Sequence, residues 1–475
     1  MRVLLAVPPT PSTLKKILGT GTPPLGIGYL AAYIREAGHD VKLIDGFEES
    51  LSKQDLIDRI KRFSPDVVGI STLTANLYRG YEMAKVIKEI DDKIKILMGG
   101  PHVSFTPEES LRECPYVDVI VRGEGEITLS ELLRELEKKK PDLKSVLGIT
   151  WRTQDGKIVS NPPRPLIEDL DKLPFPAYDL LPMDRYRVNK KVITGSMITS
   201  RGCPFGCIFC SSSKLMGKRW RGRSPENVVE EMELLIKKYG VNEIEFLDDT
   251  FTFNKERAIK IANLIRRKGL EIAWGCSSRV DTFDDEIARE LKKGGCYRIY
   301  MGIESGSQKI LKILNKGITL EKAKKAVSIA KAYGLEVIGS FIIGVPGETK
   351  KDIISTIRFA KKLGIDYAQF TLLTPYPGTF IYQYALENNL LLTKNWSLYG
   401  MLDPVMKVPG FTSKDLIKFI KRAYMSFYIN PAFFWKEMKK GRISFLKRAI
   451  NGFLKAKWTP IPEESWAKEE IAAQR

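Results

Sequence analysis

Three cysteines lie close together near the middle of the chain. They are Cys203, Cys207 and Cys210, in the segment RGCPFGCIFC that spans residues 201–210. Thiolates with this C-x3-C-x2-C spacing can bind three corners of a 4Fe–4S cluster. The fourth iron then has no protein ligand, and an open metal position is where chemistry can take place. The two glycines of the segment let the chain turn tightly around such a cluster.

A zinc site and a chance cluster of buried cysteines are the alternatives. Zinc normally takes four ligands, but the two histidines of the chain, His39 and His102, are far away in the sequence. We therefore favour the cluster. The remaining cysteines are scattered and are expected to be buried structural thiols; they are Cys114, Cys276 and Cys296. Six cysteines in 475 residues are too few for a disulfide scaffold, which predicts a cytoplasmic location, where thiols stay reduced.

The cysteine motif resembles the signature of the radical S-adenosylmethionine (SAM) enzymes, CxxxCxxC with an aromatic residue before the third cysteine, here Phe209. The resemblance implies that SAM binds the open iron through its amino and carboxylate groups. It also implies that an electron from the cluster cleaves SAM, and that the resulting 5′-deoxyadenosyl radical abstracts hydrogen from an unactivated C–H bond. The cofactor carries this chemistry, while the protein positions and shields it. A reduced ferredoxin- or flavodoxin-type protein is the expected electron donor.

Five later residues resemble the SAM-binding positions of the same family, in the same order along the chain. They are Asp248, Asp249, Arg279, Glu304 and Ser340. The resemblance implies that one of the two aspartates accepts hydrogen bonds from the SAM amino group and that the arginine pairs with the SAM carboxylate. It implies further that the glutamate contacts the ribose or methionine part, and that the segment beginning at the serine flanks the adenine.

The first 145 residues resemble the cobalamin-binding-type domain that is fused to one radical SAM subfamily. The likeness rests on residues 23–30, 99–102 and 122–126. The subfamily includes class B methylases, anaerobic Mg-protoporphyrin ester cyclase-like proteins, hopanoid-modifying enzymes and archaeal membrane-lipid ring synthases. Domains that bind cobalt through histidine carry D-x-H-x-x-G after the first strand, where this chain reads PPTP at residues 8–11. Cobalamin is therefore expected to bind without a protein histidine on cobalt, His102 is expected to be a loop hydrogen-bonding residue, and a domain that binds no cobalamin is the alternative.

The elements that must position these segments follow from the apolar pattern. Strands are expected at 3–7, 41–45, 66–71, 95–100 and 117–124, with helices between them. This alternation predicts an α/β fold whose first domain, residues 1–145, is a Rossmann-like open parallel sheet. Ligands of such sheets bind beyond the carboxyl ends of the strands, which is where the cobalamin-type segments lie.

The rest of the chain is predicted to form three further regions. Residues 146–190 are rich in proline and are expected to be a linker. Residues 191–400 resume the alternation, with strands expected at 195–200, 243–247, 271–275, 298–303, 336–343 and 367–373. Six such units predict a partial (β/α)6 barrel, because a full barrel needs eight. Residues 401–475 are expected to be a helical extension.

The chain is basic, with a net charge of +19 from 76 Lys and Arg against 57 Asp and Glu. This excess indicates an anionic partner, or a surface rich in lysine and glutamate such as thermophile proteins have. Residues 431–458 carry eight Lys or Arg and one Glu between aromatic and aliphatic residues. That pattern predicts a helix in an anionic lipid interface, with an amphipathic helix docked on the barrel as the alternative. Nucleic acid is not favoured, because the sequence shows no added RNA-binding module.

The composition, 43% hydrophobic and 28% charged, is that of a globular protein and excludes collagen-like and wholly disordered classes. A transmembrane helix is not expected, because no run of 18 uncharged apolar residues occurs. The leading interpretation is a cytoplasmic radical SAM enzyme, peripheral to the membrane, that methylates or closes a ring on a hydrophobic substrate, with an isoprenoid lipid favoured. A tetrapyrrole, peptide or small metabolite is the alternative substrate. A non-catalytic protein that carries a cluster or tetrapyrrole is the third interpretation.

Overall fold

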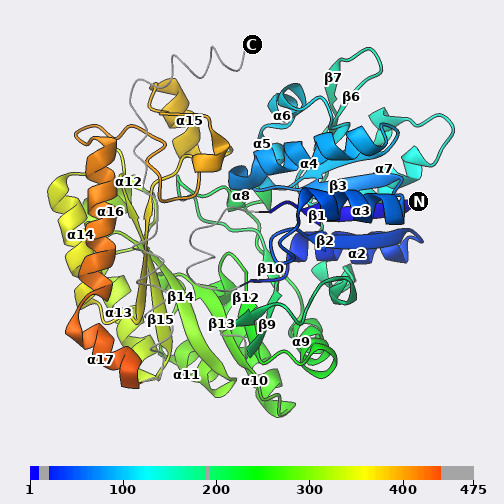
Figure 1. The fold of residues 1–475 in the computed structure, drawn as a ribbon. Coiled ribbons are helices and arrows are strands. Elements are labelled where there is room, and N and C mark those ends of the chain that lie inside the picture. Colours follow the sequence, from blue (N-terminus) through cyan, green and yellow to red (C-terminus); the bar gives the residue numbers. More distant parts are fainter. Residues whose placement is uncertain (10–20, 189–191, 440–475) are drawn as a thin grey trace.

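The computed structural model describes residues 1–9, 21–188 and 192–439. This part of the chain contains two seven-stranded sheets and one short two-stranded sheet. The first large sheet and its helices are drawn in blue and cyan in Figure 1, and the second runs from green to yellow below and beside it. Both predicted α/β units are therefore present.

The first sheet has the strand order β2-β1-β3-β4-β5-β6-β7. Its strands are β1 (Arg2–Val7), β2 (Asp40–Asp45), β3 (Val67–Ser71), β4 (Lys95–Gly99), β5 (Val119–Val121), β6 (Ile149–Arg152) and β7 (Ile158–Ser160). The first five are parallel, as expected. The order 2-1-3-4-5 places a topological switch point between β1 and β3, where ligands of doubly wound sheets bind.

Helices connect and cover the strands of this sheet. They are α2 (Leu25–Glu36), α3 (Lys53–Phe63), α4 (Leu77–Ile90), α5 (Pro101–Phe105), α6 (Pro107–Glu113) and α7 (Glu126–Leu136). Within this set α2 packs against α7, and α3 packs against α4. The first residues of α2 and α7 therefore come together at one end of the sheet, above the carboxyl ends of the strands (Figure 1).

The region predicted as a linker, residues 146–190, is only partly one. Strands β6 and β7 lie in it and extend the first sheet in antiparallel fashion. They are four and three residues long, too short for an alternating pattern to stand out between prolines. The rest of the region contacts both domains: the buried Tyr178 donates its hydroxyl to the Ser196 carbonyl of the second sheet at 3.1 Å, and Arg164 donates to Thr128 of the first domain at 2.8 Å.

The second sheet has the strand order β16-β15-β14-β13-β12-β9-β8. Its strands are β8 (Arg187–Val188), β9 (Val192–Met197), β12 (Glu243–Phe246), β13 (Ala273–Ser278), β14 (Cys296–Glu304), β15 (Glu336–Ile343) and β16 (Tyr367–Leu372). All are parallel except β8, which pairs antiparallel with β9. Six parallel strands form an open half-barrel, which confirms the predicted partial barrel.

Helices follow the strands of the half-barrel; most lie on its outside, whereas the last one lies at the top of the view, beyond the ends of the strands (Figure 1). They are α9 (Pro225–Tyr239), α10 (Lys255–Arg267), α11 (Asp285–Lys293), α12 (Gln308–Ile313), α13 (Leu320–Ala332), α14 (Lys350–Lys362) and α15 (Phe380–Glu387). Between β9 and α9 the chain forms β10 (Ser200–Arg201), α8 (Ser212–Leu215) and β11 (Arg221–Gly222). The cysteine motif follows β10, in the excursion that begins at the carboxyl end of β9.

The helical extension is present as α16 (Ser413–Tyr428) and α17 (Pro431–Lys439). Strand β16 is the edge of the half-barrel, and two tyrosines of α16 cover its polar groups. Tyr424 donates to the Phe370 carbonyl at 2.9 Å, and Tyr428 donates to the Ala368 carbonyl at 2.7 Å. Covering an edge strand in this way removes a site for unwanted pairing.

The predicted lipid-facing helix, residues 431–458, lies mostly outside the described residues. In its described part, α17, Phe433 is buried, whereas Trp435 is 61% exposed. The buried ring packs edge-on against Tyr428. Phe433 therefore belongs to the hydrophobic core. For this turn of the helix, the burial agrees with the alternative prediction of an amphipathic helix docked on the barrel. Among the described residues no helix is long and apolar enough to span a membrane.

The chain after α15 returns to the first domain. Trp396 makes an edge contact with the His102 ring, with ring centroids 4.7 Å apart. His102 is buried, and its Nδ1 lies 3.1 Å from the Thr74 hydroxyl; burial lowers the pKa of this histidine to about 4. Tyr78 donates to the Lys394 carbonyl at 3.2 Å. The contacts of Lys394 and Trp396 hold the first domain at one place, and the contacts of the cysteine-motif region hold it at another.

Candidate functional site

The loop that carries the cysteines is held against the chain that enters β11. The Cys203 N–H donates to the Gly217 carbonyl at 3.1 Å. Gly202 has a φ of +89°, and a Cβ there would lie 2.3 Å from the Arg219 carbonyl oxygen. A side chain at position 202 would therefore push the loop away, so this turn requires glycine. The three thiols are half-buried and free of disulfides.

The charges around the loop suit iron binding. Burial raises the pKa of the Cys207 thiol, whereas the positive charges of Lys316 and Arg279 lower it. These cations therefore favour the thiolate, the form that binds metal. Within the described residues no three His, Cys, Asp or Glu side chains are placed to hold a single metal ion. Three thiolates around a multi-iron cluster do not have to converge on one point.

The structure separates the two candidate aspartates at the end of β12. Asp248 is buried, and its carboxylate accepts hydrogen bonds from the Thr199 N–H at 2.7 Å, the Thr199 hydroxyl at 2.6 Å and the Ser200 hydroxyl at 2.6 Å. Asp249 is instead open to a cavity between the domains. Desolvation by the surrounding loops raises its pKa, as does the nearby charge of Asp248. Asp248 thus fixes the chain that leads to the cysteines, and Asp249 is the aspartate a ligand can reach.

Arg279 lies at the end of β13 directly under the cysteine loop. Its guanidinium is 3.6 Å from the centroid of the Phe205 ring, which lies between the first two cysteines. Two hydrogen bonds of 2.9 Å join it to Asp281, and a third of 2.7 Å joins it to the Lys316 carbonyl. Arg279 therefore supports the cysteine loop. Its pairing with the SAM carboxylate stays a prediction.

Glu304, the last residue of β14, lies beside Ser340 in the middle of β15 and beside a lysine that the sequence analysis did not predict. The Lys316 ammonium donates to Glu304 at 2.7 Å, and the Ser340 hydroxyl is 3.4 Å from the other carboxylate oxygen. Glu304 has a φ of +66°, a conformation that costs on the order of 1 kcal/mol for a non-glycine residue and clusters at functional sites. Lys316 lies in a turn after α12. The sequence alone does not distinguish a functional lysine in such a turn from one that is exposed to solvent.

A second polar group lies farther down the half-barrel. Glu245 on β12 is 3.3 Å from both the Arg298 guanidinium and the Tyr300 hydroxyl on β14. It reaches them across Gly275 on β13, where a Cβ would lie 2.5 Å from its carboxylate. Burial raises the pKa of Glu245 to about 7, although Arg298 acts in the opposite direction.

Buried ion pairs join the cysteine loop to the first domain. Arg201, two residues before Cys203, donates to Glu124 at 2.9 Å and to Glu126 at 2.6 Å. Arg221 on β11 donates to both oxygens of Glu124 at 3.0 Å. Burial by itself lowers the pKa of Arg201, but the two carboxylates more than offset this and raise it. The sequence analysis placed residues 122–126 in the cobalamin-binding-type domain. It did not predict that they contact the arginine beside the cysteine motif.

A cavity of about 290 Å³ lies at the same junction. One wall comes from the strands β1, β3 and β4 and from the first turns of α2 and α7. The other wall comes from the second domain, from residues 198–201, 215–216, 247 and 249. Glycines provide much of the first-domain wall, including Gly26, Gly69 and Gly99. Among the described residues, a Cβ at Gly26 would meet no atom within 4 Å. Neither histidine of the chain, both of which are described, lines it.

The comparisons with known proteins agree with this geometry. Residues 197–360 match the model of the radical SAM superfamily, and residues 15–133 match that of the B12 binding domain. A methyltransferase of Pyrococcus horikoshii, itself uncharacterized, is 51% identical over 96% of this chain and 98% of its own length. The chain belongs to the radical SAM superfamily. It is an enzyme, and the predicted cofactors, a 4Fe–4S cluster and SAM, are confirmed; the B12-binding match supports cobalamin as well.

Other relatives cover nearly the whole chain. The anaerobic magnesium-protoporphyrin IX monomethyl ester cyclase of Rubrivivax gelatinosus is 30% identical over 96% of this chain and 83% of its own length. Among solved structures, the radical SAM methyltransferase TsrM of Kitasatospora setae, with cobalamin and a [4Fe–4S] cluster bound, has a TM-score of 0.75 at 18% identity. It covers 95% of this chain and 99% of its own. The likeness to TsrM shows that the two-domain fold is shared.

Proposed function

We propose that this radical SAM enzyme is a cobalamin-dependent methyltransferase whose corrinoid binds at the junction of the two domains, with the cavity of about 290 Å³ holding part of it. The observation that carries the proposal is the composition of the cavity wall. Strand ends of the B12-type sheet form one side, and Asp249 and Arg201 from the cysteine-loop side form the other. A ligand bound there lies between the domain that matches B12 binding and the domain that carries the cluster. The methyltransferase with 51% identity supports the same reaction class.

The fit of the residues to the three cofactors is good. When bound, the cluster and SAM supply a carbon-centred radical that removes hydrogen from an unactivated C–H bond, and a corrinoid supplies a methyl group. Cys203, Cys207 and Cys210 would hold the cluster. Asp249 is the proposed acceptor for the SAM amino group, whereas Asp248 is already filled by internal hydrogen bonds. The glycine-lined wall and the absence of a histidine in it suit a corrinoid without a protein ligand on cobalt.

The remaining SAM contacts are proposed at the strand ends of the half-barrel. Arg279 and Lys316 place two positive charges beside Cys207, and these would neutralise the SAM carboxylate. Glu304 is proposed to contact the ribose or methionine part, and the segment from Ser340 is proposed to flank the adenine. The ion pair between Glu304 and Lys316 fixes both side chains before SAM arrives.

Anaerobic purification with measurement of iron and cobalt tests the assignment. We expect about four irons per chain and stoichiometric cobalt after incubation with hydroxocobalamin. With a reductant and an acceptor, SAM should give both 5′-deoxyadenosine and S-adenosylhomocysteine. A preparation that holds the cluster but takes up no cobalt would contradict the methyltransferase proposal.

The proposed substrate is a hydrophobic molecule, with an isoprenoid lipid as the specific expectation. The basic, aromatic sequence over 431–458 supports a lipid, whereas the cyclase relative favours a tetrapyrrole as the second candidate, with ring closure as its reaction. Methyl-labelled SAM added anaerobically to the enzyme with cell extract distinguishes them. Label in saponified lipid supports the first. Ring closure transfers no methyl group, so an unlabelled pigment that has lost hydrogen, detected by mass spectrometry, supports the second. Label only in the aqueous phase contradicts both.

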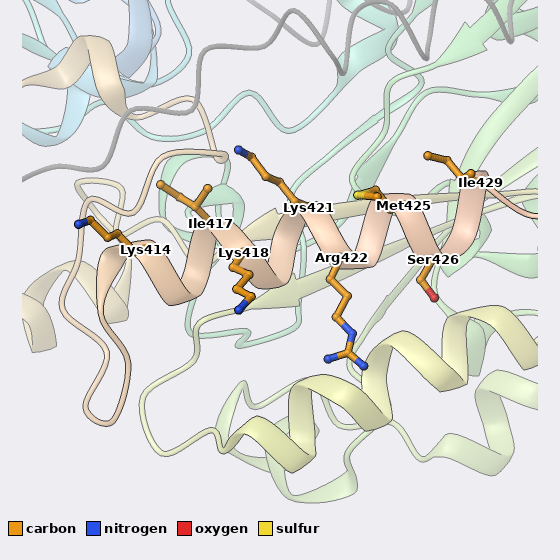
Figure 2. Close-up of a pocket in the computed structure, with 8 residues that line it drawn as sticks. All are labelled: Lys414, Ile417, Lys418, Lys421, Arg422, Met425, Ser426 and Ile429. Carbon is orange, nitrogen blue, oxygen red and sulfur yellow. The ribbon is translucent and has the colours of Figure 1, made fainter.

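Peripheral contact with an anionic membrane is part of the lipid proposal. Figure 2 shows the outer side of α16, where Lys421, Met425 and Ile429 point to one side of the helix. Met425 is 50% exposed and Ile429 is 60% exposed. Basic and apolar side chains together suit an anionic interface. Sedimentation with phosphatidylglycerol vesicles, but not with phosphatidylcholine vesicles, is expected; equal recovery with both, or with neither, would contradict membrane contact.

We also propose a reduced ferredoxin- or flavodoxin-type protein as electron donor, acting in the cytoplasm. Lys214, Lys218 and Arg219 are exposed on the segment whose backbone contacts Cys203. Acidic redox proteins would be attracted to this basic surface. Charge reversal of the two lysines should slow cluster reduction by ferredoxin severalfold and leave reduction by dithionite unchanged. Equal rates with ferredoxin would contradict this docking surface.

A further inference from the structure

Glu126 has one carboxylate oxygen that the protein does not use. Its side chain is 6% exposed, at the first position of α7 and in the cavity wall. Oε1 accepts from Arg201 at 2.6 Å, but Oε2 is buried without a hydrogen-bond partner. An unsatisfied buried oxygen is unfavourable, and more so on a charged group. A ligand that brings a donor to this oxygen would therefore bind more tightly.

Glu124 belongs to the same ion-pair network, but both of its carboxylate oxygens have hydrogen-bond partners. Its two oxygens accept from Arg201, from Arg221 and from the Ile167 N–H, the last at 2.8 Å. The protein itself therefore satisfies both oxygens of Glu124. Of the two glutamates, which both pair with Arg201, Glu126 alone keeps a carboxylate oxygen without a partner, at a residue that lines the cavity.

The charges of the network indicate what kind of donor fits. Two arginines, Arg201 and Arg221, face two carboxylates, those of Glu124 and Glu126. The group is balanced, so a third cation would add a buried unpaired charge. A neutral N–H donor, such as a primary amide, satisfies Oε2 without disturbing the balance. The side chains around a corrin ring end in such amides.

We propose that Glu126 couples the ligand in the cavity to the cluster loop, by accepting an amide N–H of the corrinoid at Oε2 while holding Arg201 at Oε1. The inference rests on the proposed function, because it takes the corrinoid as the occupant. Arg201 is two residues before Cys203, so a change at the carboxylate is transmitted to the loop through one side chain and one turn. Glu126 is thus a positioning residue for the cluster as well as a contact of the corrinoid.

Coupling of this kind is reciprocal: if the corrinoid stabilises the loop, the cluster strengthens corrinoid binding by the same factor. Two measurements on the full chain, neither of them an activity, follow from it. The first is the Kd of hydroxocobalamin, by absorbance titration, with the cluster present and with iron removed. The second is the rate at which a chelator takes iron from the oxidised cluster, with and without hydroxocobalamin.

In the wild type we expect the cluster to lower the Kd by roughly fivefold or more, a common size for allosteric coupling, and hydroxocobalamin to slow iron release. Glu126→Gln presents an amide to the incoming amide, so the Kd should rise roughly tenfold and the effect of each ligand on the other should vanish. Glu131→Gln is the matched control, because Glu131 lies on the same helix, pairs with Arg164 and does not line the cavity. It should behave as the wild type.

The outcomes separate the inference from the function on which it rests. If the wild type binds no hydroxocobalamin, the proposed function is overturned. If it binds, but Glu126→Gln binds equally well or iron release ignores the corrinoid, the coupling is overturned and the function stands. If Glu126→Gln does not fold, Glu126→Asp takes its place. Aspartate keeps the charge but is too short to reach both partners, so it should also abolish the mutual effect.

Discussion

A side chain introduced at Gly26 should block the cavity without disturbing the fold. Gly26 lies in the first turn of α2, is exposed and lines the cavity. A Cβ there meets no atom of the described part of the chain within 4 Å, so Gly26→Leu places a whole side chain in the space assigned to the corrinoid. Forcing extra methylenes into a filled site costs about 1–3 kcal/mol. At about 1.4 kcal/mol per tenfold, hydroxocobalamin should bind roughly 5- to 150-fold more weakly.

The same substitution should leave the rest of the protein intact. Replacing a helical glycine gains up to about 1 kcal/mol from helix propensity, so the melting temperature should not fall. Iron content should also be unchanged, because the cysteines lie on the opposite side of the cavity. Gly26→Ala adds a single methyl group and is the matched control, with a Kd close to that of the wild type. Wild-type affinity in Gly26→Leu would refute the placement of the corrinoid.

Three further substitutions test the cluster, the aspartates and the pH dependence. Cys203→Ala should lose iron and visible absorbance while its circular dichroism spectrum stays unchanged; retained iron would contradict the ligand assignment. Asp248→Asn should lower the unfolding free energy by about 2–3 kcal/mol, because an amide cannot accept three buried hydrogen bonds. Asp249→Asn should unfold like the wild type but bind SAM roughly tenfold more weakly, and the reverse pattern would exchange their roles. Glu245 has its pKa raised by burial from 4.5 to about 7, so the folded state holds this proton more tightly and the wild type loses stability as pH rises through that range. Glu245→Gln does not titrate, and its unfolding free energy relative to the wild type should rise by about 2–3 kcal/mol between pH 5 and pH 8 in denaturant titrations; a constant difference would contradict the raised pKa.

The parallel strands of both domains could be located from the sequence because apolar runs between helices leave few alternatives. The bounds of β15, at 336–343, were predicted to the residue, since that strand is long and buried. The short antiparallel pieces were missed. β6, β7 and β8 owe their pairing to neighbours at sheet edges and have too few residues for a local pattern.

The cysteine motif located the site, but sequence alone could not assign the neighbouring roles. Asp248 and Asp249 are adjacent, and only the hydrogen bonds from Thr199, remote in sequence, show which one is committed to the fold. Lys316 and Glu126 act through partners on other elements. Side chains brought together by tertiary structure leave no spacing signal, so these contacts required the structure.

The double attachment of the first domain has a kinetic consequence. One attachment is the buried network around Arg201, and the other is the packing of Trp396 on His102. We expect a corrinoid bound between the domains to leave faster when one of the two attachments opens. Its residence time should therefore be set by how often the domains part, and substitutions that loosen Trp396 should speed its escape even though that residue never touches it.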